Sequence, residues 1–173
     1  MAEECFADSA LDSKLRWFCT KTDDTTDMVD HVDFTIAGLP ENEDGVDVKA
    51  QKAAKRGRKV QDIAAWIELR SVPHNKKKTQ TGWLFGKAKF IAFERATTWL
   101  VVEREKLINL VASQLTTGHD VGSSSHAIGG NLYHRRFHCK ECDTKDESDV
   151  ITMIHFEDIE KIAYAVFDKS PPF

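Results

Sequence analysis

The sequence lacks the features that place a chain in a membrane or outside the cell. No apolar run approaches the roughly 18 residues that a membrane-spanning helix needs. The N-terminal segment, MAEECFADSALDSK, is acidic and has no apolar core, so we expect no signal peptide. Cysteine is scarce, with 4 residues, and without a secretion signal we expect reduced thiols in a cytoplasm. The sequence therefore predicts a cytoplasmic protein with no membrane partner.

Two common catalytic motifs are also missing. The chain has no Gly-rich phosphate loop of the NTPase type and no G-x-S-x-G nucleophile elbow. The sequence thus gives no sign of either a P-loop NTPase or a hydrolase built on such an elbow.

Overall positive charge is lacking as well, since 24 Lys and Arg residues stand against 28 Asp and Glu residues, a net charge of −4. The charge is unevenly distributed. Residues 1–48 carry 3 basic and 13 acidic residues, whereas residues 49–95 carry 13 basic and 3 acidic residues. The basic block would attract phosphates and the acidic block divalent cations. The alternative is that the two blocks pair with each other in the fold, and charge alone leaves both interpretations open.

A chain of 173 residues suits one domain with a core of its own, and 41% hydrophobic residues is an ordinary globular balance. We expect a single domain over residues 1–173. It would comprise an N-terminal helix and loop (1–30), a catalytic core (31–115) and a C-terminal part with a loop, a hairpin and a helix (116–173).

Hydrophobic periodicity predicts a mixture of helices and strands. Strands are expected at 31–36, 46–50, 65–72, 90–93 and 97–103, with a late hairpin of 132–138 and 150–155. Helices are expected at 9–19, with Ser9 as N-cap, at 104–115 and at 156–165, and residues 21–28 are expected to be a loop. The sum is an α/β (α+β) fold with a central mixed sheet flanked by helices.

The chemistry-bearing pattern is Asp33 followed, after a gap, by Asp47-Val48-Lys49. Residues two apart on a strand share a face, so Asp47 and Lys49 would emerge together, and Asp33 would lie opposite Asp47 if the two strands pair antiparallel. Such carboxylates suit Mg²⁺ or Mn²⁺, and the lysine would steady a developing negative charge. Two other D-x-K triplets, at 12–14 and 143–145, lack this strand context. The alternative is a surface ion pair on a hairpin.

Three ordered segments resemble the PD-(D/E)XK, or restriction-endonuclease-like, nuclease superfamily, and in particular its small phage and viral members. They are residues 31–33 with 46–50 (HVD and VDVKA), 66–72 (WIELRSV) and 82–94 (GWLFGKAKFIAFE). Val32 stands where the family usually has proline, and Asp47 is an accepted variant of the second acid. The resemblance spans residues 31 to about 110 and implies a restriction-endonuclease-like core and, for a viral protein, a host-cell cytoplasm.

The resemblance implies roles for five positions. Asp33 and Asp47 would be metal ligands, the carbonyl of Val48 would complete the site, and Lys49 would be catalytic. Glu68 would add a polar group from the next strand, with a strand-face ion pair to Arg70 as the equal alternative. An acidic residue of the first helix, one of Glu4, Asp8 and Asp12, would be a further ligand.

Further residues are candidates for nucleic-acid contacts. The basic side chains would follow a phosphate backbone, His31 would contact a phosphate or orient Asp33, and Trp83 would stack on an unpaired base. The alternatives are a solvated basic segment, a structural histidine and a core tryptophan. The candidates are His31, Lys52, Lys55, Arg56, Arg58, Lys59, Lys76, Lys77, Lys78 and Trp83.

A separate zinc site is conceivable near the C-terminus. Cys139 and Cys142 form a C-x-x-C half-site, and His134 and His138 would have to supply the other pair. The default is two free thiols.

The sequence as a whole predicts a Mg²⁺- or Mn²⁺-dependent deoxyribonuclease that hydrolyses phosphodiester bonds through metal-activated water. RNA is not excluded as a substrate. A Holliday-junction-resolvase-like endonuclease, acting as a homodimer, is one form of this prediction. The rival is a non-catalytic module that keeps the fold and binds nucleic acid or protein.

Overall fold

The computed structural model describes residues 2–40, 45–51, 62–71, 80–115, 121–122, 127–136 and 148–170. The chain divides into two compact units, which are described separately below. The first comprises Met1–Ile63, Lys87–Leu107 and Phe156–Phe173, and the second comprises Ala64–Gly86 and Ile108–His155. A single domain over residues 1–173 stays a prediction.

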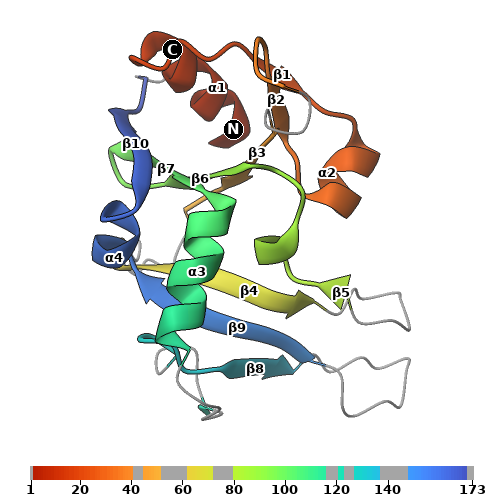
Figure 1. The fold of residues 1–173 in the computed structure, drawn as a ribbon, viewed down its shortest axis with the longest axis vertical. Helices are drawn as coiled ribbons and strands as arrows, with labels where there is room; N and C mark the ends of the chain where they lie inside the picture. The colour runs from red at the N-terminus through yellow and green to blue at the C-terminus, as the bar shows by residue number, and fades with distance from the viewer. Residues whose placement is uncertain are drawn as a thin grey trace, which may run out of the picture. The chain divides into compact units, whose positions relative to one another are not determined.

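A six-stranded mixed sheet forms the first unit (Figure 1). All neighbouring strands are antiparallel except β3 and β6, which are parallel. β6 and β7 are interior strands and are nearly continuous apolar runs, as is typical of strands buried on both faces. The strands, in spatial order, are β1 (Cys19–Lys21), β2 (Phe34–Ile36), β3 (Gly45–Lys49), β6 (Phe90–Glu94), β7 (Thr98–Glu103) and β10 (Ala163–Asp168).

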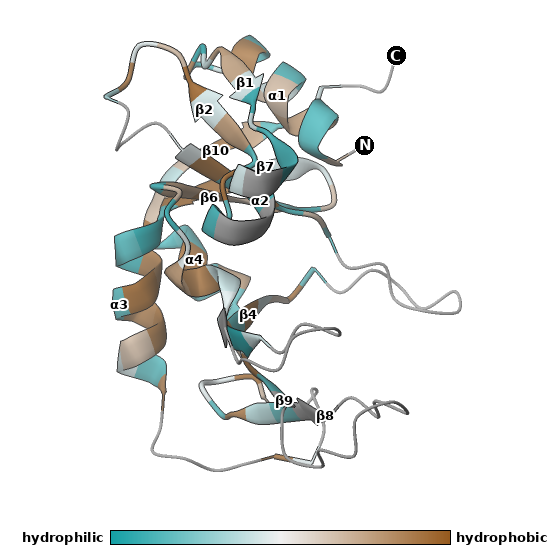
Figure 2. Cartoon of the chain, turned by 90° about the vertical axis from the view of Figure 1, so that its right-hand side faces the viewer, coloured by the Kyte–Doolittle hydropathy of each residue, from teal (hydrophilic) through white to brown (hydrophobic). Residues whose placement is uncertain are grey.

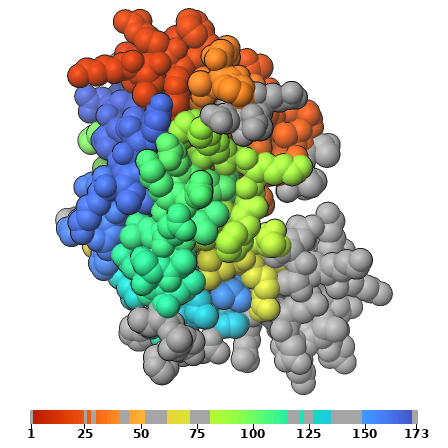
Figure 3. All heavy atoms as spheres, in the orientation of Figure 1, coloured from red at the N-terminus to blue at the C-terminus, as the bar shows by residue number. Residues whose placement is uncertain are grey.

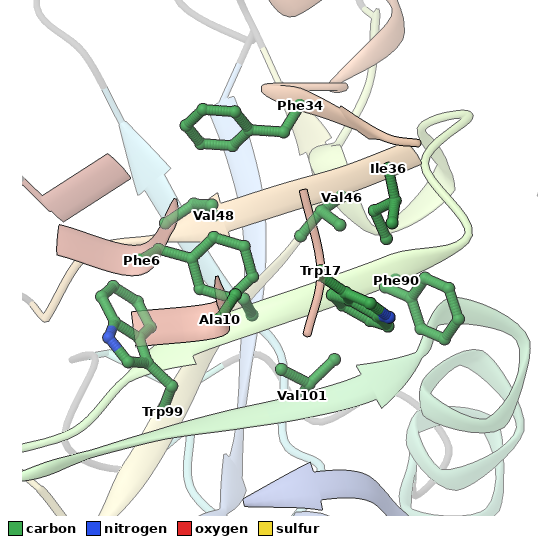
Figure 4. Packing of buried hydrophobic residues seen from close by; sticks show 11 residues of the cluster. Phe6, Ala10, Trp17, Phe34, Ile36, Val46, Val48, Phe90, Trp99 and Val101 are labelled. Carbon is green, nitrogen blue, oxygen red and sulfur yellow. The ribbon is translucent and has the colours of Figure 1, made fainter. Parts of the chain in front are cut away.

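Helix α1 (Ala2–Asp12) packs on one face of this sheet through Phe6 and Ala10, both fully buried. The Phe6 ring lies edge-on to Trp99 with ring centroids 5.2 Å apart. Val46 and Val48 of β3 belong to the same cluster, so the alternate residues of β3 point to the opposite face (Figure 4). This packing aims Asp47 and Lys49 away from the α1 core.

The ends of α1 differ from the predicted helix at 9–19. Ser9 is inside the helix, where its hydroxyl donates to the carbonyl of Cys5 at 2.6 Å, and Cys19 begins β1. The same hydroxyl accepts a hydrogen bond of 2.8 Å from the backbone N–H of Ser170, and α1 adjoins the C-terminal segment in Figure 3. The predicted N-cap at Ser9 is wrong, because residues before it extend the apolar face.

A second short helix, α2 (Asp24–Asp30), occupies the segment predicted as a loop. Asp23 caps it, because its carboxylate accepts from the N–H of Thr26 at 3.0 Å and from the Thr26 hydroxyl at 2.9 Å. Its last residue, Asp30, holds Lys87 through an ion pair of 2.9 Å and a backbone hydrogen bond of 2.7 Å. These contacts tie α2 to the segment that leads into β6.

The second unit is a four-stranded antiparallel sheet in the order β5, β4, β9, β8. Its strands are β4 (Ala64–Ser71), β5 (Gln80–Thr81), β8 (Tyr133–Arg136) and β9 (Ser148–His155), and a 3₁₀ turn, η1, covers Trp83–Phe85. A small cluster of Ala64, Ala127 and Met153 forms part of its core. The predicted pairing of the late hairpin is confirmed by β8 and β9.

The remaining helices are α3 (Arg104–Gln114) and α4 (Phe156–Glu160). The predicted helix at 104–115 is confirmed, and Figure 2 shows its hydrophobic residues along one side. The closing helix predicted at 156–165 is only half right, since the chain leaves the helix after Glu160 and joins β7 as β10. The predicted mixed sheet with helices is confirmed as a coarse architecture.

Among the described residues, no helix has both the length and the apolar character needed to cross a membrane.

Candidate functional site

Asp33 and Asp47 lie close together in the first unit. The antiparallel β2–β3 pair ends at Phe34↔Val46, so Asp33 directly precedes β2 at the level of β3 where Asp47 lies. The backbone N–H of Asp33 donates to the carbonyl of Val46 at 2.8 Å, which ties Asp33 to β3. Two carboxylates this close disfavour each other's charged form, so the pair needs a proton or a cation nearby.

Both carboxylates are buried, with Asp33 6% exposed and Asp47 1% exposed. Asp33 Oδ2 accepts a hydrogen bond of 2.5 Å from the backbone N–H of Val48. This bond joins the side chain of one predicted metal ligand to the backbone beside the other, so the two aspartates are held as one rigid group.

Lys49 lies on the same face of β3 as Asp47, and its ammonium is 2.5 Å from Asp47 Oδ1. The Lys49 side chain is 25% exposed, whereas that of Asp47 is 2% exposed. Lys49 therefore lies between a buried carboxylate and the surface, and its catalytic role stays a prediction.

The electrostatic environment of Asp33 is unusual. Burial raises the pKa of Asp33 to about 7, the hydrogen bond from Val48 opposes the shift, and the carboxyls of Asp47 and Asp27 add to it. Loss of hydration disfavours the charged form of a buried carboxyl, and neighbouring carboxyls increase this effect. Asp27 belongs to α2, so a third acidic residue reaches the site from an element predicted as a loop.

Arg104, like Asp27, is a site residue that sequence reasoning missed. It is the first residue of α3 and only 6% exposed. Its Nη2 donates to Asp47 Oδ2 at 3.2 Å and to the carbonyl of His31 at 3.5 Å, and its Nε donates to the carbonyl of Ala88 at 2.5 Å. A cation at a helix N-terminus opposes the helix dipole, which was the available signal that Arg104 is held by an acid elsewhere.

His31 precedes β2 with a left-handed backbone, φ 54°. Burial and the nearby charge of Lys49 lower the pKa of His31, so its imidazole is neutral at neutral pH. His31 therefore lies near the charges of Asp47, Lys49 and Arg104, but outside β2, which begins at Phe34, and its predicted contact with a phosphate or with Asp33 stays a prediction.

No family model matches the chain, and no significant match is found among curated proteins or solved structures. The resemblance to the PD-(D/E)XK superfamily therefore stays a prediction, and the site must be judged by its own geometry.

The side chains at this site suit Mg²⁺, which needs few protein ligands, better than an ion that is fully enclosed by protein ligands. The described part of the chain holds no group of three or more His, Cys, Asp or Glu side chains disposed around one point as metal ligands. Mg²⁺ commonly takes only one or two protein carboxylates and completes its shell with water and substrate phosphate. Asp33 and Asp47, with the Val48 carbonyl, would meet that need.

Glu68 belongs to the other unit. It lies on β4, which pairs with β5 and β9, whereas β3 pairs with β2 and β6. Glu68 is on the next strand along the chain, as predicted, but this strand belongs to a separate sheet and does not pair with β3. A role for Glu68 in the reaction stays a prediction.

Trp83 is 7% exposed within η1, which favours the core alternative over stacking on a base. His134 lies on β8. The other nucleic-acid and zinc candidates lie outside the described residues, and their predicted roles are untested: Lys52, Lys55, Arg56, Arg58, Lys59, Lys76, Lys77, Lys78, His138, Cys139 and Cys142.

Proposed function

We propose that the protein is a divalent-metal-dependent nuclease that hydrolyses phosphodiester bonds in DNA. The observation that carries the proposal is that the carboxylate of Asp33 lies beside Asp47, bonded to the backbone N–H of Val48, with Lys49 on the same face of β3 as Asp47. Two adjacent, buried carboxylates with a lysine at their exposed side are the groups that metal-assisted hydrolysis needs.

Each group has a distinct task in this proposal. Asp33 and Asp47 would hold Mg²⁺ or Mn²⁺, which lowers the pKa of water and polarises the phosphodiester when bound. Lys49, partly exposed and hydrogen-bonded to Asp47, would contact the scissile phosphate and balance the charge that develops on it. His31, neutral at neutral pH, would donate or accept a hydrogen bond without adding charge.

The decisive experiment is a cleavage assay on linear, nicked, flapped, forked and four-way DNA, with RNA as a further arm. Each substrate is incubated with Mg²⁺, with Mn²⁺ and with chelator. We expect cleavage of at least one DNA substrate with metal and none with chelator. A preference for the four-way substrate would support the resolvase-like form of the proposal.

Replacement of Asp47 by Asn should lower the cleavage rate by more than about a hundredfold while DNA binding is retained, because a ligand is lost but the shape is kept. Lys49→Met should lower the rate by about 10²–10³-fold, the usual cost of losing one charge-stabilising donor.

The matched control is Lys14 of the D-x-K triplet at the end of α1. Lys14 is exposed and follows α1, which packs on the Val46 and Val48 face of β3, so Lys14→Met should leave cleavage unchanged. Equal losses in the control and site variants would argue against a specific role for Asp47 and Lys49.

A second candidate is a non-catalytic binding module. It is favoured by the burial of Asp47 and by the cations on both of its carboxylate oxygens, Lys49 on Oδ1 and Arg104 on Oδ2. A wild-type protein that binds DNA but cuts neither DNA nor RNA with either metal would establish this alternative.

A further inference from the structure

The carboxylate of Asp47 forms ion pairs with two cations, and it is almost completely buried. Its Oδ1 pairs with Lys49 at 2.5 Å and its Oδ2 pairs with Arg104 at 3.2 Å. The two cations differ in exposure, since the side chain of Lys49 is 25% exposed and that of Arg104 is 7% exposed. A buried carboxylate needs such partners, because an isolated charge in this setting is strongly disfavoured.

Arg104 is anchored for this position by groups other than Asp47. Its Nε donates to Ala88, its Nη2 reaches the His31 carbonyl, and its backbone N–H donates to Lys89 at 2.7 Å. The guanidinium is therefore held between the segment leading into β6 and the segment leading into β2. A guanidinium has donors on three nitrogens and can reach acceptors that lie apart in this way, whereas the three donors of a lysine share one nitrogen.

We propose that Arg104 is a positioning residue that takes the place of the divalent cation beside Asp47 when the metal is absent, and so sets the affinity of the site for metal. This inference rests on the proposed function, because it assumes that Asp33 and Asp47 are the metal ligands. The guanidinium occupies the Asp47 oxygen that a metal would share and repels a second cation nearby. Metal binding then requires the Asp47–Arg104 hydrogen bond to weaken or shift.

Loss of Arg104 should change the metal affinity in the opposite direction to loss of an ordinary structural residue. Removal of a residue with a purely structural role would leave metal affinity unchanged or lower it. Removal of a cation next to a metal ligand should raise metal affinity, because the Coulomb repulsion disappears and Asp47 Oδ2 becomes available.

The test is calorimetric titration of the full chain with Mn²⁺ for the wild type, Arg104→Gln and Arg104→Lys. We expect Arg104→Gln to bind Mn²⁺ about tenfold more tightly than the wild type or better, since a full charge within a few ångströms is removed. Arg104→Lys keeps the charge and should bind Mn²⁺ about as the wild type does. Asp47→Asn should abolish binding in every background, which assigns the titrated ion to this site.

Thermal unfolding supplies a second measurement. In chelator, Arg104→Gln should unfold at a lower temperature than the wild type, and Mn²⁺ should raise its unfolding temperature by more than it raises that of the wild type. Lys106→Met is the matched control, because Lys106 follows Arg104 closely in α3 but pairs with Glu103 at the surface, where its side chain is 52% exposed. It removes the same formal charge and should leave Mn²⁺ affinity unchanged.

The outcomes separate the inference from the proposed function. If the wild type binds Mn²⁺ and Arg104→Gln binds it equally or more weakly, the inference is wrong and the nuclease proposal stands. If Arg104→Gln binds Mn²⁺ and the wild type does not, the inference about Arg104 is supported. The proposal that the wild type is a metal-dependent nuclease is then contradicted. If neither binds Mn²⁺, there is no metal site and both fail.

Discussion

At the scale of single residues, the site is a compromise between burial and charge. Asp33 shows this most clearly, because it is 6% exposed and accepts a backbone hydrogen bond, yet its pKa is raised to about 7. Burial and two neighbouring carboxyls outweigh the hydrogen bond. A charged Asp33 is thus unfavourable for the metal-free fold, which is consistent with a site arranged to receive a cation.

This gives a pH-dependent prediction for metal-free protein. The pKa of Asp33 is higher in the folded chain than the ordinary value of 3.8, so its contribution to stability is present below about pH 4 and is lost as the pH rises toward 7. Asp33→Asn should remove this loss and raise the free energy of unfolding at pH 8, by on the order of a few kcal/mol. Urea unfolding in chelator at pH 5 and pH 8 measures it, and an equal effect at both pH values would contradict the assignment.

The sequence revealed the aspartates and the lysine but not their partners. Asp33, Asp47 and Lys49 were predictable because strand alternation places them on known faces. Arg104 and Asp27 were not, because their contacts depend on how α3 and α2 pack against the sheet, and no local pattern encodes that. An arginine beginning a helix was the one visible hint.

At the scale of elements, the orientation of β3 depends on the packing of α1. Phe6 is fully buried and contacts Trp99, Phe34 and Phe167. This cluster holds the apolar face of β3, so the opposite face, with Asp47 and Lys49, has a fixed direction. The β2–β3 pairing was predictable from the alternation of apolar and polar residues. The true start of α1 was not, because its first turn is acidic and shows little apolar periodicity.

Phe6→Ala should therefore lower the free energy of unfolding by about 3–5 kcal/mol, the usual cost of truncating a buried phenylalanine. Phe18, which is 63% exposed, is the matched control, and Phe18→Ala should change stability little. Chemical denaturation of both variants provides the comparison. Similar small effects would mean that α1 does not secure the sheet as described.

At the scale of the whole molecule, the order of strands departs from the order in sequence. β3 and β6 are parallel neighbours, and the chain between them includes β4 and β5 of the second unit. A single sequence does not reveal such an arrangement, because strand pairing between distant segments leaves no local signal. The mixed sheet was predictable from alternation of strands and helices, but the second sheet was not.

The charge of the whole chain leads to a prediction about DNA affinity. If the basic block contacts phosphates, replacement of Lys55, Arg56, Arg58 and Lys59 by Gln should reduce the dependence of DNA affinity on salt. The slope of log affinity against log salt should fall by about 0.9 for each duplex phosphate that the variant no longer neutralises. Fluorescence anisotropy over a range of salt concentrations measures the slope. An unchanged slope would favour the alternative in which the basic and acidic blocks pair within the fold.

The most direct test of the central claim is a crystal structure of the protein soaked with Mn²⁺, using the anomalous signal to locate the ion. The account predicts one anomalous peak between the carboxylates of Asp33 and Asp47, about 2.1 Å from an oxygen of each. A protein that cleaves DNA with Mn²⁺ but shows its only peak away from these two aspartates would contradict the account.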